Sequence, residues 1–124
     1  DYVSYNKICG VSDLNLNNKK IADLTGIDGF TSLETLYCMN NKLNSIAVRK
    51  NAFLHALFVQ GNKLEVLDVR NGNNENFTYF DASKNPKLTC IYVDDVDWST
   101  TNWTNIDQKS TFVKDRIECD AYED

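Results

Sequence analysis

Seven short apolar triplets recur along the chain, and their spacing constrains the fold more than any other feature. Each has the form apolar-x-x-apolar-x-apolar. Four triplets begin at residues 11, 33, 54 and 77, so their starts lie 22, 21 and 23 residues apart. Three more begin at residues 43, 64 and 88, each ten or eleven residues after a member of the first series. The last two apolar positions of each triplet have the period of a strand with one buried face.

A triplet of this length is too short to bury its own apolar face, so successive coils must stack and share one continuous core. The 124 residues suit a single domain. We expect repeat coils over residues 11–93, an N-terminal cap over 1–10 and a C-terminal cap over 94–124. The side chains expected to close the C-terminal end are Trp98, Trp103, Ile106 and Phe112. Residues 71–76 are predicted to protrude as a polar loop.

Asparagine is the unusual residue of this chain, with 16 copies against five glycines and one proline. Asn41, Asn62 and Asn85 each stand eight residues after the start of a triplet, and Asn51 does so in the second series. An amide turned inward there can bond backbone groups of neighbouring coils. This spacing predicts a structural ladder of Asn41, Asn62 and Asn85.

The residues from Leu33 to Leu43 fit the pattern L-x-x-L-x-L/C-x-x-N-x-L and resemble a leucine-rich repeat. Residues 21–33 resemble the opening repeats of secreted or cell-surface leucine-rich proteins of Bacteroidetes, and residues 88–107 resemble the closing cap of that group. The resemblance implies a mostly β fold, a right-handed leucine-rich-repeat solenoid of about four coils of 21–23 residues. Short strands on both sides and a cap at each end complete that fold.

The same resemblance implies a secreted or cell-surface location, although residues 1–5 lack the basic start and apolar core of a signal peptide. Four cysteines allow three pairings if all of them pair. Cys90 and Cys119 stand at the two ends of the predicted C-terminal cap, and in an oxidising compartment we expect them to form a disulfide. Cys38 takes an inward position and is predicted to be a buried thiol. Cys9 is expected to be buried in the N-terminal cap, and whether it pairs with Cys38 stays open.

Composition and motifs argue against several classes of function. The chain has 13 Lys and Arg against 18 Asp and Glu, a formal charge of −5, and no basic run, which is unsuited to nucleic acid. Its longest apolar stretch, residues 52–59, is far shorter than a membrane span.

The motif search gives no sign of catalysis. His55 is the only histidine and takes an exposed strand position, and no phosphate-binding, zinc or nucleophile motif occurs. We therefore expect no enzyme activity, no cofactor and no metal. Asp94, Asp95 and Asp97 lie close enough for calcium but lack the spacing of a calcium loop, so a solvated surface is favoured.

The candidate binding surface comes from aligning the main triplets. One outward column reads Asn15, Tyr37, Phe58, Asp81, and the adjacent column reads Asp13, Thr35, Ala56, Tyr79. Strands about 4.8 Å apart would bring Tyr37, Phe58 and Tyr79 into one exposed aromatic patch. Its predicted rim consists of Glu34, Met39, His55, Gln60 and Ser83, and Asp81 of the outward column belongs to the same predicted ligand-binding face. Such a patch fits a binding hot spot, although aromatic residues also suit strands without any ligand.

Two functions fit this patch. The first is protein–protein interaction or adhesion by a monomer, which is favoured by the apolar area of Phe58 and Met39. The second is carbohydrate binding at a cell surface, which would use the tyrosines together with Glu34, Gln60 and Asp81. Phe58 lies at the centre and has no hydrogen-bonding group, so we favour a protein ligand over a glycan. A spacer segment of a larger surface protein is a third possibility.

Overall fold

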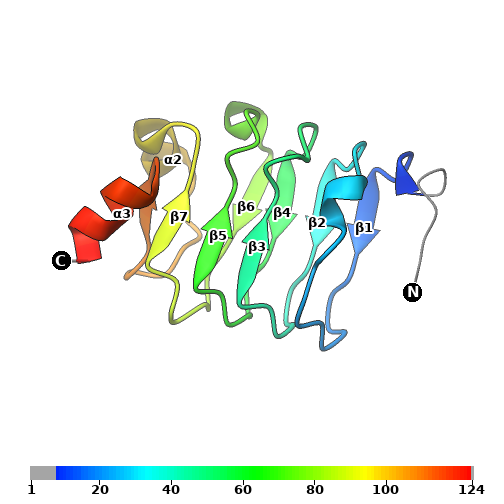
Figure 1. The fold of residues 1–124 in the computed structure, drawn as a ribbon, viewed down its shortest axis with the longest axis horizontal. Coiled ribbons are helices and arrows are strands. Elements are labelled where there is room, and N and C mark those ends of the chain that lie inside the picture. The colour runs from blue at the N-terminus through cyan, green and yellow to red at the C-terminus, as the bar shows by residue number, and fades with distance from the viewer. Residues whose placement is uncertain (1–7, 124) are drawn as a thin grey trace.

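The computed structural model describes residues 8–123, and two four-stranded parallel sheets dominate it (Figure 1). The first sheet consists of β1 (Asp13–Asn15), β2 (Thr35–Tyr37), β4 (Ala56–Phe58) and β6 (Tyr79–Asp81). The second sheet consists of β3 (Ser45–Ala47), β5 (Val66–Asp68), β7 (Cys90–Tyr92) and β8 (Thr111–Val113). From β2 to β7 the chain alternates between the two sheets, and each of the seven triplets carries one strand.

Helical segments complete the fold. They are the α-helices α2 (Val96–Asn102) and α3 (Arg116–Glu123) and the 3₁₀ turns η1 (Ile27–Gly29) and η2 (Asn74–Asn76). Each α-helix begins after an aspartate that accepts a hydrogen bond from a backbone N–H of the first turn. Asp95 Oδ1 accepts from the Trp98 N–H at 3.2 Å, and Asp115 Oδ1 accepts from the Glu118 N–H at 2.9 Å.

The predicted fold class, a mostly β leucine-rich-repeat solenoid, is wrong. Over residues 8–123 the structure has two parallel four-stranded sheets together with the short α-helices α2 and α3, an α/β-like arrangement of eight short strands. The difference has its origin in residues 94–123, where we expected only a closing cap. The capping aspartates start two helices there, and β8 between them adds a fourth strand to the second sheet. Of the N-terminal cap predicted over residues 1–10, residues 1–7 lie outside the described part.

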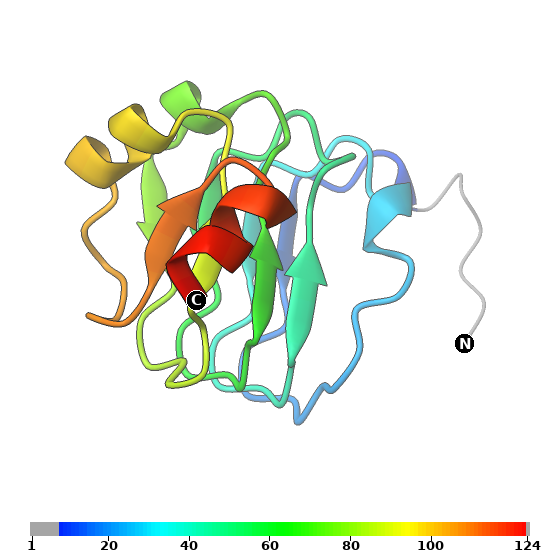
Figure 2. The same ribbon diagram turned by 60° about the vertical axis from the view of Figure 1, so that its left-hand side comes forward.

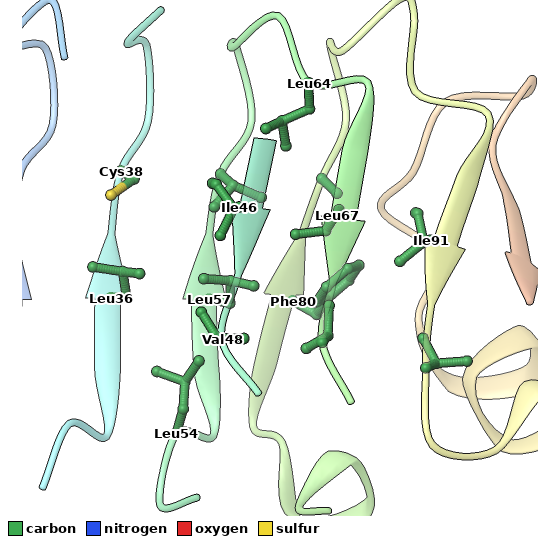
Figure 3. Close-up of a cluster of buried hydrophobic side chains, with 14 of the residues drawn as sticks. Leu36, Cys38, Ile46, Val48, Leu54, Leu57, Leu64, Leu67, Phe80 and Ile91 are labelled. Atoms are coloured by element: carbon green, nitrogen blue, oxygen red, sulfur yellow. The ribbon is translucent and has the colours of Figure 1, made fainter. Parts of the chain in front are cut away.

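The core lies between the two sheets (Figure 3). Leu36, Leu57 and Phe80 point into it from the first sheet. Ile46, Leu67 and Ile91 point into it from the second. Burial of one such side chain stabilises the fold by about 1.5–3 kcal/mol. At the C-terminal end Trp103 and Phe112 belong to this core, and Trp98 and Ile106 pack against it half-buried.

Asn41, Asn62 and Asn85 lie buried where the chain leaves the first sheet. The Asn62 Nδ2 group donates to the carbonyl oxygens of Cys38 and Val59 at 2.9 and 3.0 Å, and its Oδ1 accepts from the Leu43 N–H at 3.1 Å. Asn41 and Asn85 bond backbone groups of neighbouring coils in the same manner. Asp107 occupies the next place, accepting from the Lys84 and Asn85 N–H groups at 2.8 Å each. These side chains therefore satisfy backbone groups that have no strand partner.

The segment 71–76, expected to protrude as a polar loop, is instead bonded into the molecule. Asn71 and Asn74 are buried, and the Asn71 Nδ2 group donates to the carbonyl oxygens of Asn51 and Leu54. The Asp94 carboxylate accepts from the N–H groups of Gly72 and Asn74 at 3.2 and 3.1 Å. Because this segment carries several amides, it can satisfy its own backbone and need not extend into water.

The predicted disulfide between Cys90 and Cys119 is confirmed, with a sequence separation of 29 residues. It ties α3 to β7, and Figure 2 shows α3 lying across the outside of the second sheet. Cys90, Cys119 and Val113 form a small buried cluster beside Tyr92. Cys90 is thus covered by α3, although its strand position faces away from the main core. Within residues 8–123 no helix combines the length and apolar character needed to cross a bilayer.

Cys38 is fully buried in the core, and burial raises the pKa of its thiol to about 12. We expect this thiol to resist iodoacetamide in the folded protein at pH 8, because the thiolate is the reacting form. The test is mass spectrometry of a Cys9→Ala variant, with the adduct on Cys38 appearing only after unfolding in guanidinium. Rapid modification without denaturant would contradict the prediction.

The burial of the Cys38 thiol also determines how the stability of the fold changes with pH. The unfolded thiol ionises near its ordinary pKa, whereas the folded thiol stays protonated until about pH 12. The stabilising contribution of Cys38 is therefore complete below the ordinary pKa and is lost as the pH rises towards 12.

Candidate functional site

Side chains of the first sheet alternate between the core and the outside. Leu36 and Leu57 point inward and are fully buried, whereas Tyr37 and Phe58 beside them point outward. The parallel register pairs Tyr37 with Phe58 and pairs Ala56 with Tyr79. The outer side of this sheet therefore carries aromatic residues on three neighbouring strands.

The three rings stack on one another in a continuous aromatic row, a name we use for Tyr37, Phe58 and Tyr79. The ring centroids of Tyr37 and Phe58 lie 4.8 Å apart with the planes inclined by 10°. Those of Phe58 and Tyr79 lie 4.6 Å apart with the planes inclined by 25°. Tyr79 reaches Phe58 diagonally, because its direct partner Ala56 has too small a side chain to meet the ring.

Stacking decides which parts of the rings face a ligand. Both faces of Phe58 are covered, one by Tyr37 and the other by Tyr79. Along most of the row, only ring edges and the two phenol hydroxyls face outward. Tyr79 is half exposed, and within residues 8–123 no second aromatic ring stacks on it. One ring face at the β6 end of the row is therefore open to a ligand.

His55 lies beside the row and contacts residues from both neighbouring strand segments. Its Nε2 lies 3.3 Å from the Glu34 carboxylate, and its Nδ1 lies 3.3 Å from the Thr78 hydroxyl. One third of its side chain is exposed, so the histidine expected to be a plain surface residue is held in place on two sides. Glu34, His55 and Thr78 thus form a polar border along one side of the aromatic row.

This border contains the residue types of a hydrolytic triad, but its hydrogen bonds differ from those of one. The Thr78 hydroxyl donates to the backbone carbonyl of His55 at 3.3 Å, so its proton is not directed at the imidazole. A triad requires the hydroxyl to give its proton to the histidine. The contacts with Glu34 and Thr78 position His55 beside the aromatic row.

The other predicted rim residues lie at the opposite ends of the same strands. Met39 and Gln60 are half-buried, and Gln60 Oε1 is buried without a hydrogen-bond partner. Asp81 Oδ1 accepts from both the N–H and the hydroxyl of Ser83, at 3.0 and 2.7 Å. The structure thus engages Asp81 within its own turn.

Asp94 and Asp95, two of the three neighbouring aspartates near α2, serve separate structural roles. Asp94 binds the backbone of the segment 71–76, and Asp95 caps α2. In the part of the chain that the structure describes, no group of three or more His, Cys, Asp or Glu side chains is placed to hold a metal ion.

A groove that the sequence did not predict lies beside β6, where Trp98 and Trp103 were expected only to close the core. Its volume is about 280 Å³, and it adjoins the exposed end of the aromatic row. It is lined by Phe77, Thr78, Tyr79, Phe80, Trp98, Asn102, Trp103, Thr104 and Asn105. The signal available in the sequence was the position of the two tryptophans, which both lie within residues 98–103.

No family model matches this chain, and no curated protein is significantly similar to it. The resemblance to secreted bacterial proteins consequently stays a prediction. Function has to be inferred from the chemistry of the surface.

Proposed function

We propose that this protein is a non-enzymatic recognition module that binds a partner protein through the exposed side of the first sheet. The observation that carries the proposal is the stacked aromatic row. It forms a preformed apolar strip with a polar border, which is the anatomy of a protein-binding hot spot. Because stacking already orders the rings, little side-chain freedom is lost when a partner binds.

The geometry of the row favours a protein over a flat sugar along most of its length. A sugar ring packs against an open aromatic face, and both faces of Phe58 are covered. Ring edges and phenol hydroxyls suit aliphatic, aromatic and backbone groups of a protein. The border contributes Glu34 and contains neither Lys nor Arg, which favours a neutral or basic partner surface.

We also propose that the module works outside the cytoplasm, in adhesion or attachment at a cell surface. The Cys90–Cys119 disulfide is compatible with that location, because disulfides persist in oxidising compartments. The acidic net charge of −5 supports a partner other than nucleic acid.

The test of this proposal is a binding screen of the intact chain against an array of purified extracellular proteins. For any protein that binds, we expect the double variant Tyr37→Ala/Phe58→Ala to lose affinity about 30-fold, or about 2 kcal/mol. The measurement is surface plasmon resonance with both proteins at matched concentrations.

Val66→Ala supplies the matched control, because Val66 is an exposed apolar residue of the second sheet. It should bind like the parent chain. Equal affinity of the parent and the double variant would refute the proposal, as would a partner whose binding depends on Val66. Melting temperatures of all variants would establish that each one is folded.

A further inference from the structure

The groove beyond β6 has a lining that is distinct from the rest of the surface. It lies between the β6 segment, α2 and the residues that follow α2, with Tyr79 at its border. Residues of α2 and β6 both line this groove, although β7 separates the two elements in sequence. None of its nine lining residues carries a charge, in a chain whose formal charge is −5. A neutral ligand fits this groove better than an ionic one.

Aromatic rings form the base of the groove. Trp103 is almost fully buried and stacks on Phe80 with ring centroids 4.1 Å apart. Trp98 meets Trp103 edge to face at 5.6 Å and is itself half-buried. These contacts fix the indole rings before any ligand arrives. Tyr79 adds the open ring face at the end of the aromatic row.

Polar side chains stand at the edge of the groove. Asn102 and Asn105 are exposed, and the exposed Thr78 and Thr104 also line the groove. The Asn102 Nδ2 group donates to the Trp98 carbonyl at 2.8 Å, which orients the amide. The backbone carbonyl of Asn105 accepts from the Ala82 N–H at 2.9 Å, which holds this segment beside β6. The two amides can thus offer both donors and acceptors to a ligand.

We propose that this groove binds one neutral pyranose ring of a polysaccharide. A pyranose has apolar C–H groups on its faces and hydroxyls around its rim, which matches an open aromatic face beside neutral amides and hydroxyls. The volume of about 280 Å³ is at the lower end for small-molecule sites, as expected for a single ring. The groove shares Tyr79 with the aromatic row and Thr78 with its polar border, but its other lining residues lie outside the protein-binding surface, so the two proposals can be tested separately.

The experiment uses tryptophan fluorescence, because the two tryptophans of the chain both line the groove. The intact protein is titrated with cellohexaose, laminarihexaose, xylohexaose and mannohexaose, and with hexagalacturonic acid as the charged comparison. We expect a saturable change in emission with at least one neutral hexasaccharide, at a Kd of about 1 mM or tighter. Hexagalacturonic acid should bind at least about tenfold more weakly.

Asn105→Ala and Tyr79→Ala should each weaken neutral-sugar binding by at least fivefold to tenfold, about 1–1.4 kcal/mol. Tyr37→Ala is the matched control, because it removes a tyrosine from the far end of the row and should leave sugar binding unchanged. Calorimetric titration repeats the measurement for any variant with altered fluorescence, and melting temperatures report folding.

The proposal is overturned if no neutral hexasaccharide gives a saturable change. It is equally overturned if hexagalacturonic acid binds as well as the neutral sugars, or if Asn105→Ala and Tyr79→Ala bind like the parent chain. Loss of protein binding in Tyr37→Ala with intact sugar binding would support two separate sites. Failure of the protein screen alone would leave the sugar result unaffected.

Discussion

Replacing Asn62 with alanine is expected to lower the free energy of unfolding by about 4 kcal/mol, because it leaves several buried backbone groups without partners. The Asn62 amide donates to the carbonyl oxygens of Cys38 and Val59 and accepts from the Leu43 N–H. The side chain is only 5% exposed, so water reaches these groups poorly. Urea unfolding followed by circular dichroism measures the effect.

Asn44→Ala is the matched control for this prediction. Asn44 is exposed, and its side chain makes no hydrogen bond within residues 8–123. We expect its effect to stay within about 0.5 kcal/mol. If Asn62→Ala lowers the free energy of unfolding by less than about 1 kcal/mol, water or a shifted backbone must satisfy the backbone groups that the Asn62 amide binds. The structural role assigned to the buried asparagines would then be wrong.

Removing the Cys90–Cys119 disulfide is expected to lower the free energy of unfolding by about 3.5 kcal/mol. The bond spans 29 residues of sequence, so in the unfolded chain it closes a loop that contains α2, β8 and the first half of α3. Without it the unfolded state gains conformational entropy. The folded state also loses the link that holds α3 against Val113 and Tyr92. The measurement is urea unfolding of the double variant Cys90→Ala/Cys119→Ala beside the parent chain.

Reduction of the parent chain with dithiothreitol provides an independent comparison. The reduced parent and the double variant should unfold at similar urea concentrations, and both should unfold well below the oxidised parent. Hydrogen exchange should increase first in α3 and β8, which depend on the bond most directly. Unchanged stability after reduction would contradict the prediction.

Strand positions followed from the sequence because their signal is local. In each triplet, the residues that alternate between core and surface are neighbours in the chain, as with Leu36 and Tyr37. Equal spacing of the triplets also determined which residues lie opposite one another, so the columns of Tyr37 with Phe58 and of Ala56 with Tyr79 could be read in advance. The structure has these residues opposite one another, and their role in binding stays a prediction.

The structure of residues 94–123 was predicted less well from the sequence, because it depends on contacts between residues that are distant in the chain. β8 carries no repeated triplet and exists because Phe112 meets Ile91 across the parallel pair. The helices α2 and α3 begin at Asp95 and Asp115, whose capping role is a weak signal in sequence alone. The fold class was therefore wrong although the strand positions were not.

The sequence alone determined the period of the strands, the buried asparagines and the side of the first sheet that carries aromatic residues, because each depends on spacing along the chain. Only the tertiary structure decided that two parallel sheets combine with two helices. It also decided that Tyr79 leans past Ala56 onto Phe58 and keeps one face open beside Trp98 and Asn102. The residues in these contacts are about 20 apart in sequence. Such contacts depend on lateral packing and side-chain size, and local periodicity does not predict them.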